Sequence, residues 1–380
     1  MGSTHLFVAP TESSFGELIL GMRLAHELHA RGDRIVFLAP AAHAALLAET
    51  PFVHAPIDPH LKTLDRDLAG LARTFGAADV ILIDLMVTLV TVGMLKLDLG
   101  FLDALPVPVI ALDIWDLRHN TLRMDLLGLS LTFPDAARTV VPRRLVPVPF
   151  ARPDCPGAYS ALPPPAALTA ADRARTRAGL GLADDDRLVV LTASNGQSQL
   201  KPVQLSAAGA SLDRVARGCQ AAGERVHVVH LGPLPLRECG PRYRHHPQVL
   251  VSAFQRLLQA ADLLVTANQS ATGISTAISL GTPALVAINA APTDPDAPQF
   301  RFRVFPFGMV DFMNPLLERN PYADAIPTVE IYAGDALTAR ARDLLFDDAV
   351  RAAALAKMAA YAAEVRRLPG GAERVRELLG

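Results

Sequence analysis

The chain has 380 residues, of which 51% are hydrophobic and 19% are charged, and its formal net charge at pH 7 is −2. A chain of this length favours two domains, and the hydrophobic fraction is enough to build a substantial core in each. The near-neutral charge gives no electrostatic footprint for nucleic acid and therefore argues against nucleic acid as a partner.

The first half of the chain alternates short apolar runs with helical patterns. A strand is expected at His5–Ala9, and the apolar residues between Phe15 and Leu28 recur at helical spacing until Arg31-Gly32 ends the helix. Further strands are expected at Arg34–Ala39, Asp79–Leu85 and Val107–Asp113. Near-continuous apolar strands separated by helices are typical of a parallel sheet covered on both faces.

A Pro-rich stretch at Ala151–Pro165 is the best candidate for a linker, and a helix is expected after it at Ala166–Ala178. A second alternating series then begins. Its expected strands are Arg187–Leu191, Val226–Leu231, Val249–Ala253, Leu263–Thr266 and Ala284–Ile288, and its helices are Leu205–Ala222, Phe254–Ala260, a segment ending at Gly281, and the tail Asp335–Leu379.

This pattern predicts an α/β fold with two doubly wound, Rossmann-like parallel sheets. The expected division is an N-terminal domain at residues 1–150, a linker at 151–185, a second domain at 186–345 and C-terminal helices at 346–380.

Neither a membrane span nor an export signal is expected. The most apolar window, Val80–Leu102, is interrupted by charged residues such as Asp84 and Lys96, which favours buried strand plus helix. A strand begins almost at the N-terminus, which argues against a signal peptide. The three cysteines, Cys155, Cys219 and Cys239, are far apart and lack metal-ligand spacing. We therefore expect a cytoplasmic protein without integral membrane contact.

Two polar turns of the second half each follow a buried strand. Thr192–Ser198 follows the strand that ends at Leu191, and Asn268–Gly273 follows the strand that ends at Thr266. Ligands of open α/β sheets bind at this carboxyl edge, and helix N-termini collect the unpaired N–H groups that suit phosphate. Helix capping explains either turn alone, whereas the pair favours a site for the two phosphates of a diphosphate.

The segment Ala261–Ile288 resembles the donor-binding segment of GT-B glycosyltransferases, a two-Rossmann-domain family that includes macrolide and plant natural-product transferases. Ala261-Asp262 and Gly281-Thr282-Pro283 match the family's pattern, with the same spacing from Asn268 to Pro283. Asn268 stands where the family has a histidine, which implies a diphosphate ligand. Gln269, Ser270 and Thr272 replace glycines, and Thr276 replaces a glutamate that usually holds the ribose.

The resemblance implies a nucleotide-diphosphate sugar of the UDP or TDP type as donor, with no tightly bound cofactor and no metal. His245–Val249 resembles the family's linker into this segment, and Phe254 then lies near the nucleotide base, although a core phenylalanine is the alternative. The implied nucleotide-binding residues are Ser194, Asn195, Gly196, Gln197, Phe254, Asn268, Gln269, Ser270, Thr272, Gly273 and Thr276.

The N-terminal segment resembles the same superfamily through Phe15-Gly16-Glu17, Leu24–Leu28 and Arg31-Gly32-Asp33, where the family usually has Arg-Gly-His. Glu17 occupies the place of a histidine that activates the acceptor, and a carboxylate can serve as general base. The alternative is a first-turn acid that stabilises the helix dipole.

Further candidates follow two other expected strands. Asp113 is a second catalytic candidate because it follows Val107–Leu112 at the carboxyl edge of the first sheet, together with Trp115, Asp116 and His119. Trp115 lines an acceptor pocket or closes the core. The loop after Ile288 contains Asp294, Asp296 and Gln299. The resemblance implies that an acidic residue and the glutamine of this loop contact the sugar, and ordinary loop composition explains these residues equally well.

Other readings are disfavoured by missing motifs. The chain has no Gly-x-Gly-x-x-Gly fingerprint for NAD, no Gly-Lys-Ser/Thr loop for ATP and no Gly-x-Ser-x-Gly elbow. His227 and His230 lie on an expected strand and are better interpreted as sheet residues than as metal ligands.

The sequence therefore predicts a glycosyltransferase that moves a sugar to a small-molecule acceptor by an inverting, metal-independent mechanism, in natural-product or cell-envelope biosynthesis. It allows a homodimer. The alternatives are a sugar-nucleotide epimerase of the same fold and a non-catalytic binding or scaffold protein.

Overall fold

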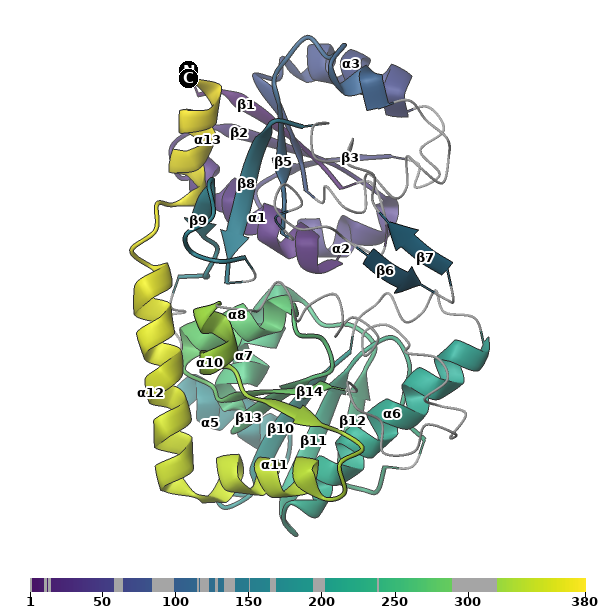
Figure 1. The fold of residues 1–380 in the computed structure, drawn as a ribbon, viewed down its shortest axis with the longest axis vertical. Coiled ribbons are helices and arrows are strands. Elements are labelled where there is room, and N and C mark those ends of the chain that lie inside the picture. The colour runs from purple at the N-terminus through teal and green to yellow at the C-terminus, as the bar shows by residue number, and fades with distance from the viewer. Residues whose placement is uncertain are drawn as a thin grey trace. The chain divides into compact units, whose positions relative to one another are not determined.

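The computed structural model describes residues 2–9, 12, 15–57, 64–83, 99–114, 116, 123–126, 129–132, 141–149, 151–164, 169–193, 202–237, 239–288 and 320–380. The chain divides into two compact units (Figure 1). The first unit comprises Met1–Leu122, Thr132–Ala161 and Val365–Gly380, and the second comprises Arg123–Leu131 and Leu162–Glu364. A separate two-stranded sheet pairs β6 (Arg123–Leu126) with β7 (Leu129–Thr132).

Within the described residues, the first unit contains a seven-stranded sheet in the order β3-β2-β1-β4-β5-β8-β9. The strands pair in parallel, and they are β1 (Thr4–Val8), β2 (Arg34–Ala39), β3 (Val53–Pro56), β4 (Asp79–Leu82), β5 (Val109–Leu112), β8 (Arg143–Val148) and β9 (Ala158–Ser160). The accompanying helices are α1 (Phe15–His29), α2 (Ala44–Leu47), α3 (Leu64–Phe75) and α13 (Gly371–Leu379), with 3-10 turns at Ala41–His43 and Leu99–Leu102.

Helix α1 illustrates how the sequence sets this architecture. Its apolar residues fall on one stripe, and Leu18, Leu24 and Leu28 are almost completely buried. Gly32 has a φ of 92°, a left-handed conformation that glycine adopts without strain, and it lies in the turn between α1 and β2.

The C-terminal helix α13 completes the first unit. Ser160 of β9 forms an isolated parallel bridge with Gly370, and the Ser160 N–H donates to the Pro369 carbonyl at 3.0 Å. Helix α1 also contacts the start of α13, because the Ala372 N–H donates to Glu27 Oε2 at 3.1 Å. These contacts anchor residues 365–380 to α1 and β9.

The second unit repeats the same topology with a parallel sheet in the order β12-β11-β10-β13-β14-β15. Its strands are β10 (Arg187–Thr192), β11 (Val226–Leu231), β12 (Tyr243–His246), β13 (Leu263–Thr266), β14 (Ala284–Ile288) and β15 (Thr328–Glu330). Its helices are α5 (Ala170–Gly179), α6 (Pro202–Ala221), α7 (Val251–Ala260), α8 (Thr272–Leu280), α10 (Pro321–Ala325), α11 (Ala336–Phe346) and α12 (Asp348–Val365).

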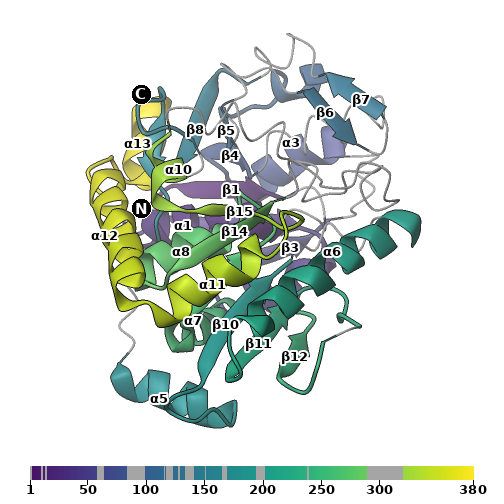
Figure 2. The same cartoon turned by 60° about the horizontal axis from the view of Figure 1, so that its bottom comes forward.

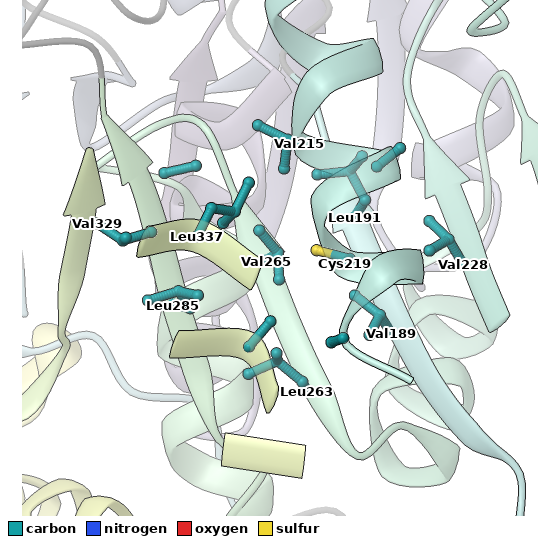
Figure 3. Close-up of a cluster of buried hydrophobic side chains, with 14 of the residues drawn as sticks. Val189, Leu191, Val215, Cys219, Val228, Leu263, Val265, Leu285, Val329 and Leu337 are labelled. Atoms are coloured by element: carbon teal, nitrogen blue, oxygen red, sulfur yellow. The ribbon is translucent and has the colours of Figure 1, made fainter. Parts of the chain in front are cut away.

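Helices α6 and α11 pack side by side over one face of this sheet (Figure 2). Alternate strand residues point toward them, so that Val189, Val265 and Leu285 meet Val215 and Leu337 in one hydrophobic cluster (Figure 3). The intervening residues, such as Leu264, are equally buried on the other face, where α7 and α8 contact β10 and β14. A sheet covered on both faces explains the continuous apolar runs in the sequence.

The predicted fold class is confirmed, and one predicted element is wrong. Val249–Ala253 is not a strand, because α7 begins at Val251, and the strand that pairs with β11 is Tyr243–His246. This strand lies at the sheet edge and carries polar, partly exposed side chains. It therefore lacks the apolar run by which its neighbours were predicted.

No helix in the described part of the chain is long and apolar enough to cross a membrane.

Candidate functional site

The centre of the second sheet is the point at which its strand order reverses. Strands β10 and β13 are neighbours there, and their last residues, Thr192 and Thr266, are Cα partners. Chain connections leave such a pair of strands in opposite directions, which opens a crevice at the carboxyl edge where α/β proteins bind ligands. The Asn268 turn follows β13 at this edge, as the sequence predicts.

The Asn268 turn is held by its own side chains. The Asn268 N–H donates to Thr266 Oγ1 at 3.2 Å, which fixes the turn to the strand end. Asn268 Oδ1 accepts two hydrogen bonds from Ser270, from its N–H at 3.0 Å and from its hydroxyl at 2.9 Å. These donors occupy the amide oxygen. The Asn268 Nδ2 group has no hydrogen-bond partner among the described residues.

Helix α8 starts directly after this turn without a side-chain cap. Its N-cap residue, Ala271, cannot accept from the first N–H groups, so those of Thr272 and Gly273 are directed out of the helix end. The dipole of the helix adds partial positive charge at the same place. Gly281, with a φ of 67°, ends the helix in the left-handed conformation.

Three residues with predicted roles lie around this helix end. The Thr276 hydroxyl is 3.4 Å from the Thr272 carbonyl oxygen, and the residue is only 4% exposed. Gln269 is also buried, and its backbone carbonyl accepts from the Tyr322 hydroxyl at 2.7 Å. The ring of Phe254 packs against the helix entrance, because a Cβ placed on Gly273 would lie 3.1 Å from Phe254 Cζ. Phe254 thereby shapes the entrance.

His230, on β11, is a polar residue at this edge that the sequence did not assign to the site. The Leu236 N–H donates to the Tyr243 hydroxyl oxygen at 2.9 Å, and that hydroxyl is 2.9 Å from His230 Nδ1. Either tautomer of the ring can form this contact, because the hydroxyl can donate its proton to Nδ1 or accept a second hydrogen bond from it. Burial, with a smaller effect of His245, lowers the pKa of His230 to about 3, so the imidazole is neutral.

Two buried polar atoms at the edge lack a hydrogen-bond partner among the described residues: His230 Nε2 and Thr192 Oγ1. Thr192 ends β10, which borders the switch point, and His230 lies one residue before the end of the neighbouring strand β11. The sequence signal that could have assigned these two residues to the site is a hydroxyl or imidazole group near the end of a buried strand.

In the first unit, Glu17 lies in the first turn of α1 and is partly buried. Burial raises its pKa, and a backbone hydrogen bond opposes this effect only in part. A carboxylate with a raised pKa is a better proton acceptor than an exposed one, which fits a general base.

Asp113 follows β5 directly and is buried against Arg144. Its Oδ2 lies 3.0 Å from Arg144 Nη1, and both side chains are almost inaccessible. Asp116 follows in a left-handed conformation with a φ of 47°, and the Cys155 thiol donates to its Oδ2 at 3.3 Å. Burial, with the Asp116 carboxylate, raises the pKa of this thiol to about 12. The carboxylate of Asp113, which the sequence predicts as catalytic, is thus held in an ion pair with Arg144.

The remaining candidates lie outside the described residues. They are Asp84, Trp115, His119, Ser194, Asn195, Gly196, Gln197, Asp294, Asp296 and Gln299. Among the residues that are described, no group of three or more His, Cys, Asp or Glu side chains is arranged to hold a metal ion.

Several solved structures share this fold. Spinosyn forosaminyltransferase SpnP superposes with a TM-score of 0.62 and 17% identity, with 100% of both chains covered. Glycosyltransferase VinC in complex with DTDP gives 0.55 and 15%, covering 99% of this chain and 98% of its own. Spinosyn rhamnosyltransferase SpnG complexed with spinosyn aglycone gives 0.54 and 17%, with 100% of both covered. The fold is therefore GT-B.

The sequence matches no curated protein. It does match the model of a family described as "Family of unknown function (DUF6365)", over residues 24–300 and 293–380. The match extends through both units, and the chain therefore belongs to this family.

Proposed function

We propose that this protein is a glycosyltransferase that moves a sugar from a nucleoside-diphosphate sugar to a small-molecule acceptor. The observation that carries the proposal is the Asn268 turn, which joins the switch point of a Rossmann-like sheet to a helix end without a side-chain cap. The similarity in fold to SpnP, VinC and SpnG supports it. Natural-product or cell-envelope biosynthesis is the setting that we propose.

The donor diphosphate is proposed to bind at this turn. Asn268 Nδ2 donates to one phosphate, since Ser270 already occupies the amide oxygen. The N–H groups of Thr272 and Gly273 donate to the same or the adjacent phosphate. The ring of Phe254 borders the entrance, where it can contact the nucleoside. The resemblance and the DTDP bound to VinC support a donor of the UDP or TDP type.

The proposed reaction is an inverting displacement. Glu17 removes the proton from the acceptor hydroxyl or amine as that group attacks the anomeric carbon of the sugar. The bond from that carbon to the diphosphate oxygen breaks, and negative charge develops on the leaving diphosphate. The preorganised N–H groups and the dipole of α8 stabilise this charge, which is the role that a metal ion fills in other enzymes.

Titration calorimetry with UDP, TDP, GDP and ADP tests the donor site. We expect UDP or TDP to bind, and absence of binding by all four at about millimolar concentration overturns the proposal. Asn268→Asp is the sharpest variant, because it keeps the oxygen that accepts from Ser270 and replaces the donating Nδ2 by a charged oxygen. We expect it to weaken binding about tenfold or more. Arg256→Gln, at an exposed position of α7, is the matched control.

Product analysis separates transfer from the alternatives. A transferase releases free nucleotide from the donor only when acceptor is present. An epimerase converts the sugar nucleotide without acceptor and without nucleotide release. A binding protein retains affinity for nucleotide but gives neither product.

A further inference from the structure

The second unit contains a pocket of about 500 Å³ at the opposite edge of its sheet from the Asn268 turn. Arg187, which lines the pocket, is the first residue of β10, and Asp262, which also lines it, immediately precedes β13. Strands rise roughly 3.3 Å per residue, so the six residues of β10 separate the two edges by about 16 Å. The pocket is therefore separate from the candidate nucleotide site.

The one buried carboxylate of this pocket is already neutralised. Asp262 Oδ1 lies 2.9 Å from Arg173 Nη2, and Asp262 Oδ2 lies 3.2 Å from Arg177 Nη1. The Leu188 N–H also donates to Asp262 Oδ2 at 2.8 Å. Two guanidinium groups on a single carboxylate leave an excess of positive charge.

The same two arginines are held rigidly. Arg173 donates to the Ala261 carbonyl at 3.2 Å, and Arg177 donates to the carbonyls of Ala260 at 3.2 Å and Asp186 at 2.7 Å. These carbonyls include those at the C-terminal end of α7, which accept charged donors well. Helix α5, which packs against α7, is thereby fixed with its arginines facing the sheet edge. The positive charge is preorganised.

Two further arginines increase this charge. Arg187 uses its Nε to donate to the Leu345 carbonyl at 3.1 Å, and its Nη groups have no hydrogen-bond partner among the described residues. Arg351 lies close by, with its Nη1 3.2 Å from the Asp262 carbonyl. Burial lowers the pKa of Arg351, the charges of Asp262 and Asp348 oppose that effect, and the charges of Arg173 and Arg187 add to it. The other carboxylate that lines the pocket, Asp184, is exposed to solvent.

We propose that this pocket binds the phosphate group of a small phosphorylated metabolite. The Nη groups of Arg187 donate to the phosphate oxygens, because a guanidinium matches them with two parallel N–H groups. Arg173, Arg177 and Arg351 provide the surrounding positive potential, and the volume is that of a small-molecule site. The proposal does not depend on the proposed transferase activity.

The test is calorimetry with inorganic phosphate at constant ionic strength, which holds charge screening fixed. Ala174 lies on the exposed face of α5 and lines the pocket, whereas Ala171 is exposed on the same helix but does not line it. Ala174→Glu places a carboxylate in the pocket without removing any hydrogen bond, and Ala171→Glu is the matched control. We expect Ala174→Glu to weaken phosphate binding about tenfold, and Ala171→Glu to leave it unchanged.

Two further variants complete the test. Arg187→Gln should weaken binding by a similar factor, with circular dichroism confirming that the variant is folded. Asn268→Asp reports whether the ion binds instead at the turn on the other sheet edge. The proposal is overturned if phosphate does not bind at about 10 mM, or if the two alanine variants bind it equally. Loss of phosphate binding in Asn268→Asp instead locates the ion at the candidate nucleotide site.

Discussion

His5 and Asp79 form a buried pair that joins two neighbouring strands of the first sheet, with His5 Nδ1 2.7 Å from Asp79 Oδ2. The two residues are Cα partners in the pairing of β1 with β4. On the other side of the ring, Asp33 Oδ2 lies 3.3 Å from His5 Nε2. Burial alone lowers the pKa of His5, but the hydrogen bond and charge of Asp79, together with Asp33, outweigh it and raise the pKa.

This raised pKa makes folding stability depend on pH. A histidine whose pKa is raised on folding contributes stability that is fully present below its unfolded value, which is 6.5, and is lost as the pH rises through the folded value. We expect the difference in unfolding free energy between wild type and His5→Gln to be larger at about pH 5.5 than at about pH 8.5. Urea unfolding at both pH values measures it. Equal losses in His5→Gln at both pH values contradict the assignment.

The ion pair of Asp113 with Arg144 predicts a large loss of stability when one partner is removed. Asp113→Asn leaves a buried guanidinium without its carboxylate, and we expect a loss of about 3–5 kcal/mol in the free energy of unfolding. The double variant Asp113→Asn/Arg144→Gln should lose less than the sum of the single variants, because the residues interact directly. Asp103→Asn, which is exposed, serves as control. Additive losses in urea unfolding would show that the pair is not coupled.

Glu17 gives a kinetic prediction that rests on the proposed transferase activity. Glu17→Gln should abolish turnover and keep nucleotide affinity, whereas the exposed Glu49→Gln should retain both. A general base acts deprotonated, and burial raises the pKa of Glu17 above 4.5, so kcat/KM should fall as the pH drops through this raised value. Unchanged turnover in Glu17→Gln removes this residue from the mechanism.

Glu27 is expected to hold the C-terminal helix in place. Its Oε2 accepts the Ala372 N–H at the start of α13, where no side chain of the helix itself provides a cap. Glu27→Ala should cost about 1 kcal/mol, as for other lost caps, and should speed hydrogen exchange in residues 371–379. Glu49→Ala is the control. Unchanged exchange in this segment would show that the contact contributes nothing to its order.

The sequence located most strands of the sheet interiors but missed β8, which lies between β5 and β9. The ranges Arg34–Ala39, Val226–Leu231, Leu263–Thr266 and Ala284–Ile288 coincide with β2, β11, β13 and β14. Each is mostly apolar, because parallel strands are buried on both faces. The edge strand Tyr243–His246 has no such apolar character, which is why it was missed.

The candidate site could be predicted only in part. The position of the Asn268 turn follows from its strand and helix, which are local features. The partners of the candidate residues are not local in sequence. The Gln269 carbonyl accepts from Tyr322, and in the first unit Asp113 forms an ion pair with Arg144. Asp33 stands where the GT-B pattern usually has a histidine. Its contact with His5 could not be predicted, because the two residues come together only in the folded sheet.

The return of residues 365–380 to the first unit has a consequence for biosynthesis. Helix α13 contacts α1 and β8, which are encoded more than 200 residues earlier. Domains generally fold in the order in which they leave the ribosome, but here the earlier unit lacks part of its structure until residue 380 has been translated. The second unit, which ends at Glu364, can be finished first. The surfaces of α1 and β8 that α13 finally covers are therefore exposed on the nascent chain during most of its synthesis.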